Sequence, residues 1–135
     1  FEDHFVAVVS RQSSLAAANE LSWADLLAQD FITLQRPSLV RRLLEQALQL
    51  QAIALPVAFE SHQLSTVGRM VADGLGVSAV PSMCIQQMHE LGAHCVPLTT
   101  PGVSCRVGIL THQELSVAAQ ALRNVLLDTV QAPSL

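Results

Sequence analysis

Short apolar runs alternate along this chain with longer segments whose apolar residues recur at helical spacing. A continuous apolar run of about five residues, rich in β-branched side chains, is typical of a strand buried on both faces. Residues 5–9 have this pattern, and shorter runs follow at intervals. The predicted strands are residues 5–9, 31–34, 56–60, 77–80, 95–98 and 105–110.

The most regular helical pattern runs from Leu39 to Gln51. Its apolar residues come in pairs at helical spacing, with charged and amide residues between the pairs, which predicts a helix with a broad apolar stripe. Ser38 is its predicted N-cap. Other helices are predicted at 23–28, where Ser22 and Asp25 form a capping box, at 81–90, and after the cap Ser116.

The stretch from Ser61 to Pro81 combines a polar opening, a helix-period run and a short apolar strand. Gly74 stands where the helix end requires a left-handed residue, a conformation that glycine adopts without a Cβ penalty. A polar helix N-terminus offers unpaired backbone N–H groups and a positive dipole end, which suits a small anion or polar ligand. We interpret this stretch as one lip of a ligand cleft. The apolar face of its helix consists of Leu64, Val67, Met70 and Val71.

The alternation of strands and helices predicts an α/β fold, with a mixed, mostly parallel sheet flanked by helices. In such sheets ligands bind outside the carboxyl ends of the strands, on the loops that lead into helices. Two polar loops have this position, residues 33–38 and 61–66.

The composition argues against several classes of function. The 135 residues allow one domain with a core, and half of them are hydrophobic. The net charge is −4, with no basic stretch beyond Arg41 and Arg42, so this piece alone should bind nucleic acid poorly. No apolar run approaches the ~18 residues that cross a bilayer, so no membrane partner is predicted. Three cysteines without a Cys-x-x-Cys pair argue against a disulfide scaffold and suit a reducing cytoplasm.

Candidate chemistry is sparse. His89 and His94 lie five residues apart, which does not fit the i and i+4 histidines of a zinc helix. No Gly-x-Ser-x-Gly elbow occurs, so an enzyme reading has little support. We predict no metal, no cofactor and no catalytic residue. The simplest interpretation of Cys84, Cys95 and Cys105 is as small apolar residues in or near the core.

Several segments in order carry a family resemblance. They are Asp-Leu-Leu-Ala-Gln-Asp-Phe-Ile-Thr-Leu at 25–34, Ser-x-x-Arg-x-Leu-Leu at 38–44, and Val-Ala-x-Gly-Leu-Gly-Val-x-x-x-Pro at 71–81. Together with the opening strand they resemble the effector-binding region of LysR-type transcriptional regulators. The resemblance implies a type II periplasmic-binding-protein-like fold: two α/β lobes, two crossover strands, and an effector cleft between the lobes.

The resemblance also implies a division of the chain. Residues 1–9 would be one crossover strand, 10–95 the second lobe, and 96–135 the return crossover with the last strand and helix of the first lobe. The rest of the first lobe and the winged helix-turn-helix DNA-binding domain would lie outside this sequence. The implied function is sensing of a small molecule, expected to be an organic anion, that alters DNA binding. The alternative is a stand-alone solute-binding protein of the same fold.

The resemblance places effector contacts on the two polar loops. Arg36 would anchor a carboxylate, or be a solvated loop arginine. Ser61 and Thr66 would donate to the ligand or cap the helix. A dimer or tetramer is implied, formed through the helix from Leu39 to Gln51 and the following strand. The expected ligand-binding residues are Gln35, Arg36, Pro37, Ser38, Ser61, His62 and Thr66.

Overall fold

Strand β1 (Glu2–Ser10) is the central strand of the sheet in the computed structural model, which describes residues 1–100 and 102–129. It pairs antiparallel with β5 (Ser78–Pro81) on one side and with β6 (Ala93–Thr100) on the other. Its first residues, Glu2 to His4, instead pair with β7 (Ser104–Arg106). Side chains 5–9 are all buried, as the continuous apolar run predicted.

The sheet is mixed, as predicted, but parallel pairing is less dominant than expected. β2 (Leu21–Ser22) pairs parallel with β6, and β3 (Phe31–Leu34) pairs parallel with β4 (Val57–Ser61). All three partners of β1 are antiparallel to it. β3 and β4 form a separate two-stranded sheet. An isolated bridge at Val77, with backbone hydrogen bonds to residues 30 and 32, joins it to the five-stranded sheet around β1.

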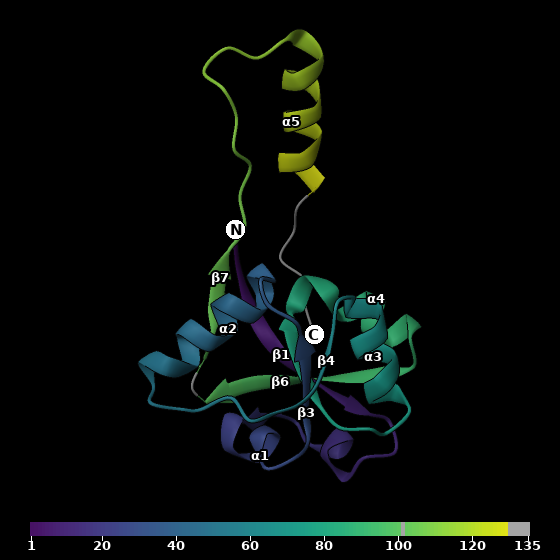
Figure 1. Ribbon diagram of the computed structural model, residues 1–135. Coiled ribbons are helices and arrows are strands. Elements are labelled where there is room, and N and C mark those ends of the chain that lie inside the picture. The colour runs from purple at the N-terminus through teal and green to yellow at the C-terminus, as the bar shows by residue number, and fades with distance from the viewer. Residues whose placement is uncertain (101, 130–135) are drawn as a thin grey trace.

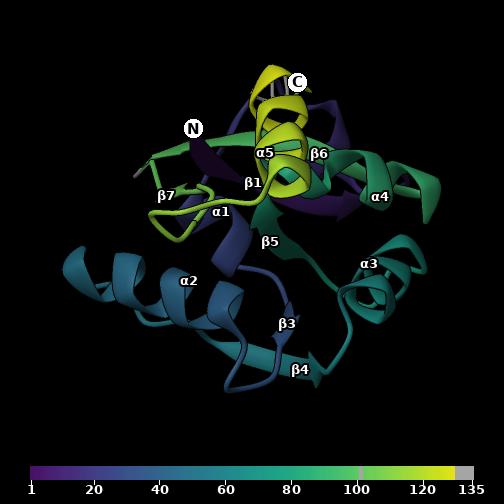
Figure 2. The same cartoon turned by 90° about the horizontal axis from the view of Figure 1, so that it is seen from above.

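Helices cover both faces of the sheet. Phe5, Ala7 and Val9 point into one core with α1 (Trp23–Leu27) and α2 (Leu39–Leu50), because alternate side chains of a strand point to opposite faces. Val6 and Val8 point into a second core with α3 (Leu64–Ala72) and α4 (Ile85–Glu90). Figure 2 shows α2 on one side of the strands and α3 with α4 on the other.

Local sequence signals explain where the helices begin and end. The capping box at α1 is confirmed: Ser22 Oγ accepts from Asp25 N–H, and the Asp25 carboxylate accepts from Ser22 N–H. α3 ends in a Schellman motif, in which Leu75 N–H donates to Met70 O and Gly74, with φ of +84°, has the predicted left-handed conformation. The predicted helix at 81–90 consists of a 3-10 turn (Ser82–Cys84) followed by α4. A second 3-10 turn, Ser14–Ala17, follows β1.

The last part of the chain stands away from the sheet. β7 ends at Arg106, so the predicted strand at 105–110 is wrong beyond that residue. An extended segment then leads to α5 (Val117–Thr129), which projects from the body in Figure 1. Ser116 caps α5 as predicted, by accepting from Ala119 N–H. The helix buries none of its described side chains, so its apolar residues, among them Leu122, Val125 and Leu126, are uncovered. Residues 101 and 130–135 of the predicted return segment lie outside the described residues.

Within the described ranges, no helix is both long and apolar enough to cross a membrane.

Candidate ligand-binding edge of the sheet

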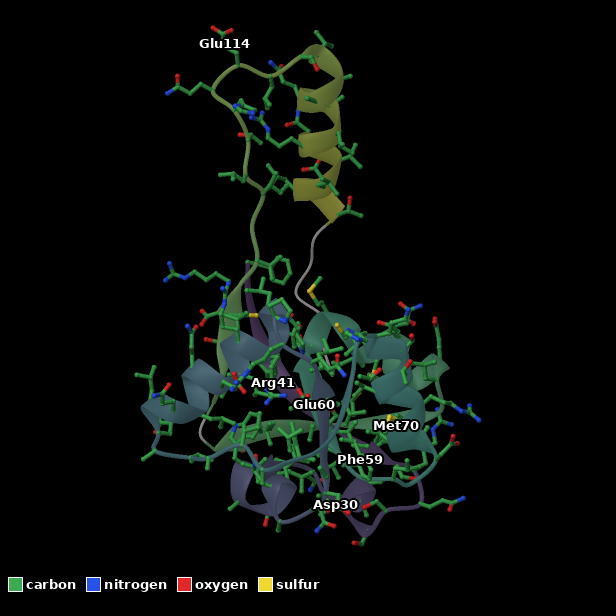
Figure 3. The ribbon with its side chains drawn as sticks, in the orientation of Figure 1. Asp30, Arg41, Phe59, Glu60, Met70 and Glu114 are labelled. Carbon is green, nitrogen blue, oxygen red and sulfur yellow. The ribbon has the colours of Figure 1, made fainter. Side chains whose placement is uncertain are left out.

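The two predicted loops lie side by side. Leu34 and Ser61, the last residues of β3 and β4, are paired in the parallel register, and Gln35 N–H donates to Ser61 O at 2.9 Å. In Figure 3, Asp30 marks the start of β3, and Glu60 lies near the end of β4 on the side toward α5. The carboxyl ends of β3 and β4 therefore form one edge of the sheet, from which α2 and α3 begin.

Neither helix that begins at this edge has a side-chain cap. Ser38 is the N-cap of α2, as predicted, but its hydroxyl makes no capping hydrogen bond. The N-cap of α3 is Gln63, again without a side-chain bond, so capping by Ser61 or Thr66 is wrong. Ser61 Oγ accepts from Gln63 N–H at 3.3 Å in the turn before the helix, and Thr66 lies exposed in the first turn. Neither first turn contains an acidic residue.

This lack of caps has an electrostatic consequence. The first N–H groups of a helix have no partner within the helix, and the helix dipole puts partial positive charge there. α1, in contrast, has both a capping serine and an acidic residue in its first turn. The edge formed by α2 and α3 is thus suited to accept negative charge from a ligand.

Arg36 lies on this edge but already has a carboxylate partner. Its Nη2 and Nε atoms donate to the two carboxylate oxygens of Glu45, at 2.8 and 3.2 Å. Three quarters of the Arg36 side chain remains exposed to solvent. Its hydrogen bonds lower the pKa of Glu45, and the same contact raises the pKa of Arg36. Arg36 is therefore a largely solvated loop arginine, as one of the two predictions had it, but it is paired with Glu45. Its role as an anchor for a ligand carboxylate stays a prediction.

The sequence analysis predicted no role for Arg41 in the site, yet Arg41 is the centre of an ion network. Its residue is only 6% exposed, and its guanidinium contacts Glu45 at 2.6 Å and Glu60 at 2.8 Å. It also donates to the carbonyl oxygen of Leu34 at 3.2 Å. The helical pattern placed Arg41 among the solvent-facing residues of α2. The i, i+4 spacing of Arg41 and Glu45 was the one sequence signal for this contact.

The network opens onto a hollow of about 430 Å³ between α2 and the segment leading to β4. Arg36, Arg41 and Glu45 form its polar wall. The rest of its lining comes from Gln49 and residues 52–55. A second hollow, of about 330 Å³, lies at the opposite end of β3 and includes Asp30 and residues 74–77.

The remaining predicted residues are at the same edge. Gln35 is half-buried, and its carbonyl accepts from Ser38 N–H at 3.0 Å. Pro37 follows a cis peptide bond and is exposed, as is His62. The structure thus brings the two loops together through Gln35 and Ser61, while Arg36 is turned toward α2.

Asp3 forms a second buried polar site, which the sequence did not indicate. It is 1% exposed and lies where β1 changes partner from β7 to β5 and β6. Its carboxylate accepts from the Ser82 hydroxyl, from Met83 N–H at 3.3 Å, and from His4 N–H at 2.8 Å. These bonds fix the start of β1 to the turn that precedes α4.

The cysteines lie in or beside the core, as predicted. Cys95 is buried, and Cys84 and Cys105 are partly buried. Burial raises the pKa of all three thiols, that of Cys95 to about 12. The rings of His89 and His94 stack with centroids 6.1 Å apart. Among the described residues, no group of three or more His, Cys, Asp or Glu side chains could hold a metal ion.

A mixed sheet covered by helices on both faces is the α/β architecture of type II periplasmic-binding-protein-like domains. The sequence profile described as LysR substrate binding domain matches residues 1–131. The chain therefore belongs to the LysR substrate-binding domain family, and the resemblance drawn from its motifs is confirmed.

Two curated relatives are transcriptional regulators. The chain is 29% identical over 126 residues to the uncharacterized HTH-type transcriptional regulator YbhD of Escherichia coli, covering 92% of this chain and 40% of YbhD. It is also 29% identical over 131 residues to the uncharacterized HTH-type transcriptional regulator YfeR of Shigella flexneri, covering 92% of this chain and 41% of YfeR. The chain thus spans about two fifths of these relatives. These matches favour a regulator over the alternative of a stand-alone solute-binding protein.

Solved structures show the same fold at low identity. The regulatory domain of CcmR from Synechocystis PCC6803, in complex with 2-PG, aligns with a TM-score of 0.75 at 18% identity, covering 95% of this chain and 63% of that one. The effector-binding domain of QuiR, in complex with shikimate, aligns with a TM-score of 0.70 at 16% identity, covering 94% and 61%. HinK, a LysR family regulator from Pseudomonas aeruginosa, aligns with a TM-score of 0.71 at 23% identity, covering 92% and 44%.

Proposed function

We propose that this domain senses a small organic anion for a LysR-type transcriptional regulator. The observation that carries the proposal is the pair of uncapped N-termini of α2 and α3 at one sheet edge, with no acidic residue in either first turn. The relatives named as regulators, and the domains solved with shikimate or 2-PG, support it. Shikimate is itself a carboxylic acid, and a carboxylate matches the positive character of helix N-termini.

The proposed ligand contacts are the two adjacent loops. Backbone N–H groups at the starts of α2 and α3 would hold the anion, and nearby hydroxyl, imidazole and guanidinium groups would set its orientation. The second half of the cleft would come from a first lobe outside this sequence. The residues proposed to contact the ligand are Gln35, Arg36, Pro37, Ser38, Ser61, His62 and Thr66.

The proposed division of the chain follows the same logic. Residues 10–95 would form the second lobe, with residues 1–9 and 96–135 running to and from the first. The uncovered apolar side chains of α5, including Leu122, Val125 and Leu126, favour this division, because neighbouring exposed apolar side chains often mark a surface that a partner covers. The first lobe of the same polypeptide would be that partner.

Signalling in this proposal needs no covalent chemistry. The ligand would bind one arrangement of lobes or subunits more tightly than another and so shift the equilibrium between them. DNA would be contacted in the cytoplasm through a separate DNA-binding domain. Subunits would pair through α2 and β4, where Leu39, Leu50 and Phe59 are exposed. Charged substitutions at Leu50 and Phe59 should reduce the sedimentation coefficient of the oligomer, whereas Leu110→Glu should not.

A substitution that separates stability from binding tests the anion site. Gln63→Asp places a capping carboxylate at the start of α3, which should stabilise the fold by about 1 kcal/mol. The same charge should weaken binding of an anion at this edge. Binding is measured by calorimetry against a panel of metabolites that includes shikimate and its methyl ester. Gln46→Glu, the same charge change at an exposed position in the middle of α2, is the control. If Gln63→Asp bound an anionic ligand as tightly as the unchanged chain, the site would lie elsewhere.

A further inference from the structure

Arg36 has the geometry of an anion site that is already filled. A guanidinium and a carboxylate form their strongest contact through two parallel N–H···O bonds. Arg36 makes both of these bonds to Glu45. The carboxylate of Glu45 therefore occupies the position that an organic acid would take on this arginine.

Glu45 does not depend on Arg36 for its partner. One of its oxygens also accepts from Nε of Arg41 at 2.6 Å. Arg41 is nearly buried, whereas most of the Arg36 side chain is in solvent. If Arg36 moved away, Glu45 would keep a cation, and no buried charge would be left without one.

Arg41 would also keep all of its hydrogen bonds if Arg36 moved away. It is held by Glu60 at 2.8 Å and by the carbonyl oxygen of Leu34, in addition to Glu45. Arg41 thus anchors the network to β3, β4 and α2. Figure 3 shows Arg41 and Glu60 next to each other at the upper end of β4. Arg36 is the member of the network whose release leaves the other contacts unchanged.

We propose that Glu45 is a built-in competitor that occupies Arg36 until an anionic ligand displaces it. The inference rests on the proposed function in one respect, that ligands reach the loop containing Arg36. A ligand anion would take over the two guanidinium bonds, and Glu45 would stay on Arg41. Because only the released fraction of Arg36 can bind, Glu45 lowers the apparent affinity of this arginine for anions. Glu45 therefore sets the ligand concentration at which the site responds.

The contact between Glu45 and Arg36 also links the ligand loop to α2. An anion that takes Arg36 removes one of the two cations from Glu45, a residue in the middle of α2. The proposed subunit contact lies on α2, so ligand binding would change the charge distribution on that helix. The ion exchange is thus a direct physical route from ligand to subunit surface.

The test measures Arg36 itself. All seven basic residues of the chain are arginines, so a ¹⁵N spectrum of arginine Nε–H groups contains few signals. The chain and Glu45→Gln are titrated with sulfate at constant ionic strength, and the Arg36 signal is followed. Exposed ion pairs change affinity modestly, so we expect half-saturation of the Arg36 shift at about two- to fivefold less sulfate in Glu45→Gln. Urea, a neutral planar solute, should give no such difference.

Arg69 and Asp73 provide a matched control. They form an exposed i, i+4 pair on α3 at 3.4 Å. Asp73→Asn should sharpen the sulfate response of Arg69 and leave that of Arg36 unchanged. Glu60→Gln, which removes another carboxylate from the network, should leave the sulfate response of Arg36 close to that of the unchanged chain.

The outcomes are separable. Equal half-saturation of Arg36 in the unchanged chain and in Glu45→Gln would overturn the inference, even if a metabolite bound to the loops. Tighter sulfate binding at Arg36 in Glu45→Gln supports it, even if no metabolite from the panel bound and the sensing proposal failed. An equal gain in sulfate affinity at Arg36 in Glu60→Gln would also overturn the inference. The gain would then come from the loss of any nearby negative charge and not from the release of Arg36.

Discussion

The carbonyl oxygen of Asp30 lies so close to Gly76 that a Cβ atom on Gly76 would stand 2.2 Å from it. The same oxygen accepts from Val77 N–H at 2.9 Å, and this bond helps to join the two-stranded β3–β4 sheet to the five-stranded sheet. Gly76 is therefore required for its lack of a side chain, at the junction that positions both ligand loops.

Gly76→Ala should destabilise the fold. The new methyl group would meet backbone atoms, which cannot move without separating β3 from β5, so we expect a loss of about 1–3 kcal/mol in the free energy of unfolding. Chemical denaturation measures it. Gly108→Ala is the control, because nothing lies within 4 Å of a Cβ there, and it should change stability by less than about 1 kcal/mol. Equal effects of the two substitutions would contradict the close approach at Gly76.

Ser22 and Ser38 are both N-cap serines, but only Ser22 makes capping bonds. Ser22→Ala should therefore cost about 1 kcal/mol, and Ser38→Ala less than about half of that. Thermal unfolding of the two variants side by side is sufficient. A cost at Ser38 as large as at Ser22 would mean that the start of α2 is capped after all, and the argument for an open anion site there would weaken.

Much of the fold could be predicted from local patterns. The buried strand at 5–9 and the helix from Leu39 follow from runs and spacings that depend on neighbouring residues alone. Such patterns do not give strand direction, which explains why the antiparallel partners of β1 were not expected. They also do not show what covers an apolar face. The stripe on α5 has the pattern of a core helix, yet the structure leaves it exposed.

The closeness of the two polar loops could be predicted from the sequence, but their side-chain contacts could not. Parallel pairing of β3 and β4 brings their loops together, as the sequence led us to expect. The partner of Arg36 is nine residues along the chain and was not foreseen, because a loop conformation decides it. Arg41 is buried because Glu60, nineteen residues away, helps to neutralise it, and no periodicity reports that contact.

Cys95 should be the least reactive of the three thiols. Burial raises its pKa to about 12, and the thiolate is the reactive form. At pH 8 a disulfide reagent should label Cys84 and Cys105 first, and Cys95 at the rate of opening of the fold. Mass spectrometry of peptides identifies the labelled sites. Early labelling of Cys95 would contradict its place in the core.

The same thiol makes stability depend on pH at the alkaline end. An unfolded cysteine loses its proton near pH 9.0, whereas folded Cys95 holds it to about 12. The folded state thus binds more protons between these values, and stability falls as the pH rises above 9. Cys95→Ala should show a smaller decline between pH 8 and pH 10, in urea unfolding, than the unchanged chain.

Glu45 should make the free energy of unfolding depend on pH in the acid range. Hydrogen bonds from Arg36, and a further one from Arg41, hold its pKa below the ordinary 4.5. Between the lowered pKa of the folded chain and the ordinary 4.5, the unfolded chain binds more protons than the folded chain, so stability rises with pH in this range. The contribution of Glu45 is fully present above pH 4.5 and is lost as the pH falls through its lowered pKa. The difference in unfolding free energy between the unchanged chain and Glu45→Gln should therefore shrink from pH 6 to pH 3.

A control separates this effect from the loss of any negative charge. Glu90 lies exposed on α4, where its carboxylate accepts from the Gln86 amide at 2.9 Å. Glu90→Gln removes the same charge without touching an arginine pair, so its difference from the unchanged chain should vary less over the same pH range. A difference for Glu45→Gln that stayed constant down to pH 3 would mean that Glu45 is not held by Arg36 and Arg41 in solution. The competitor role proposed for Glu45 would then lose its structural basis, because a carboxylate that is not bound to Arg36 cannot block it.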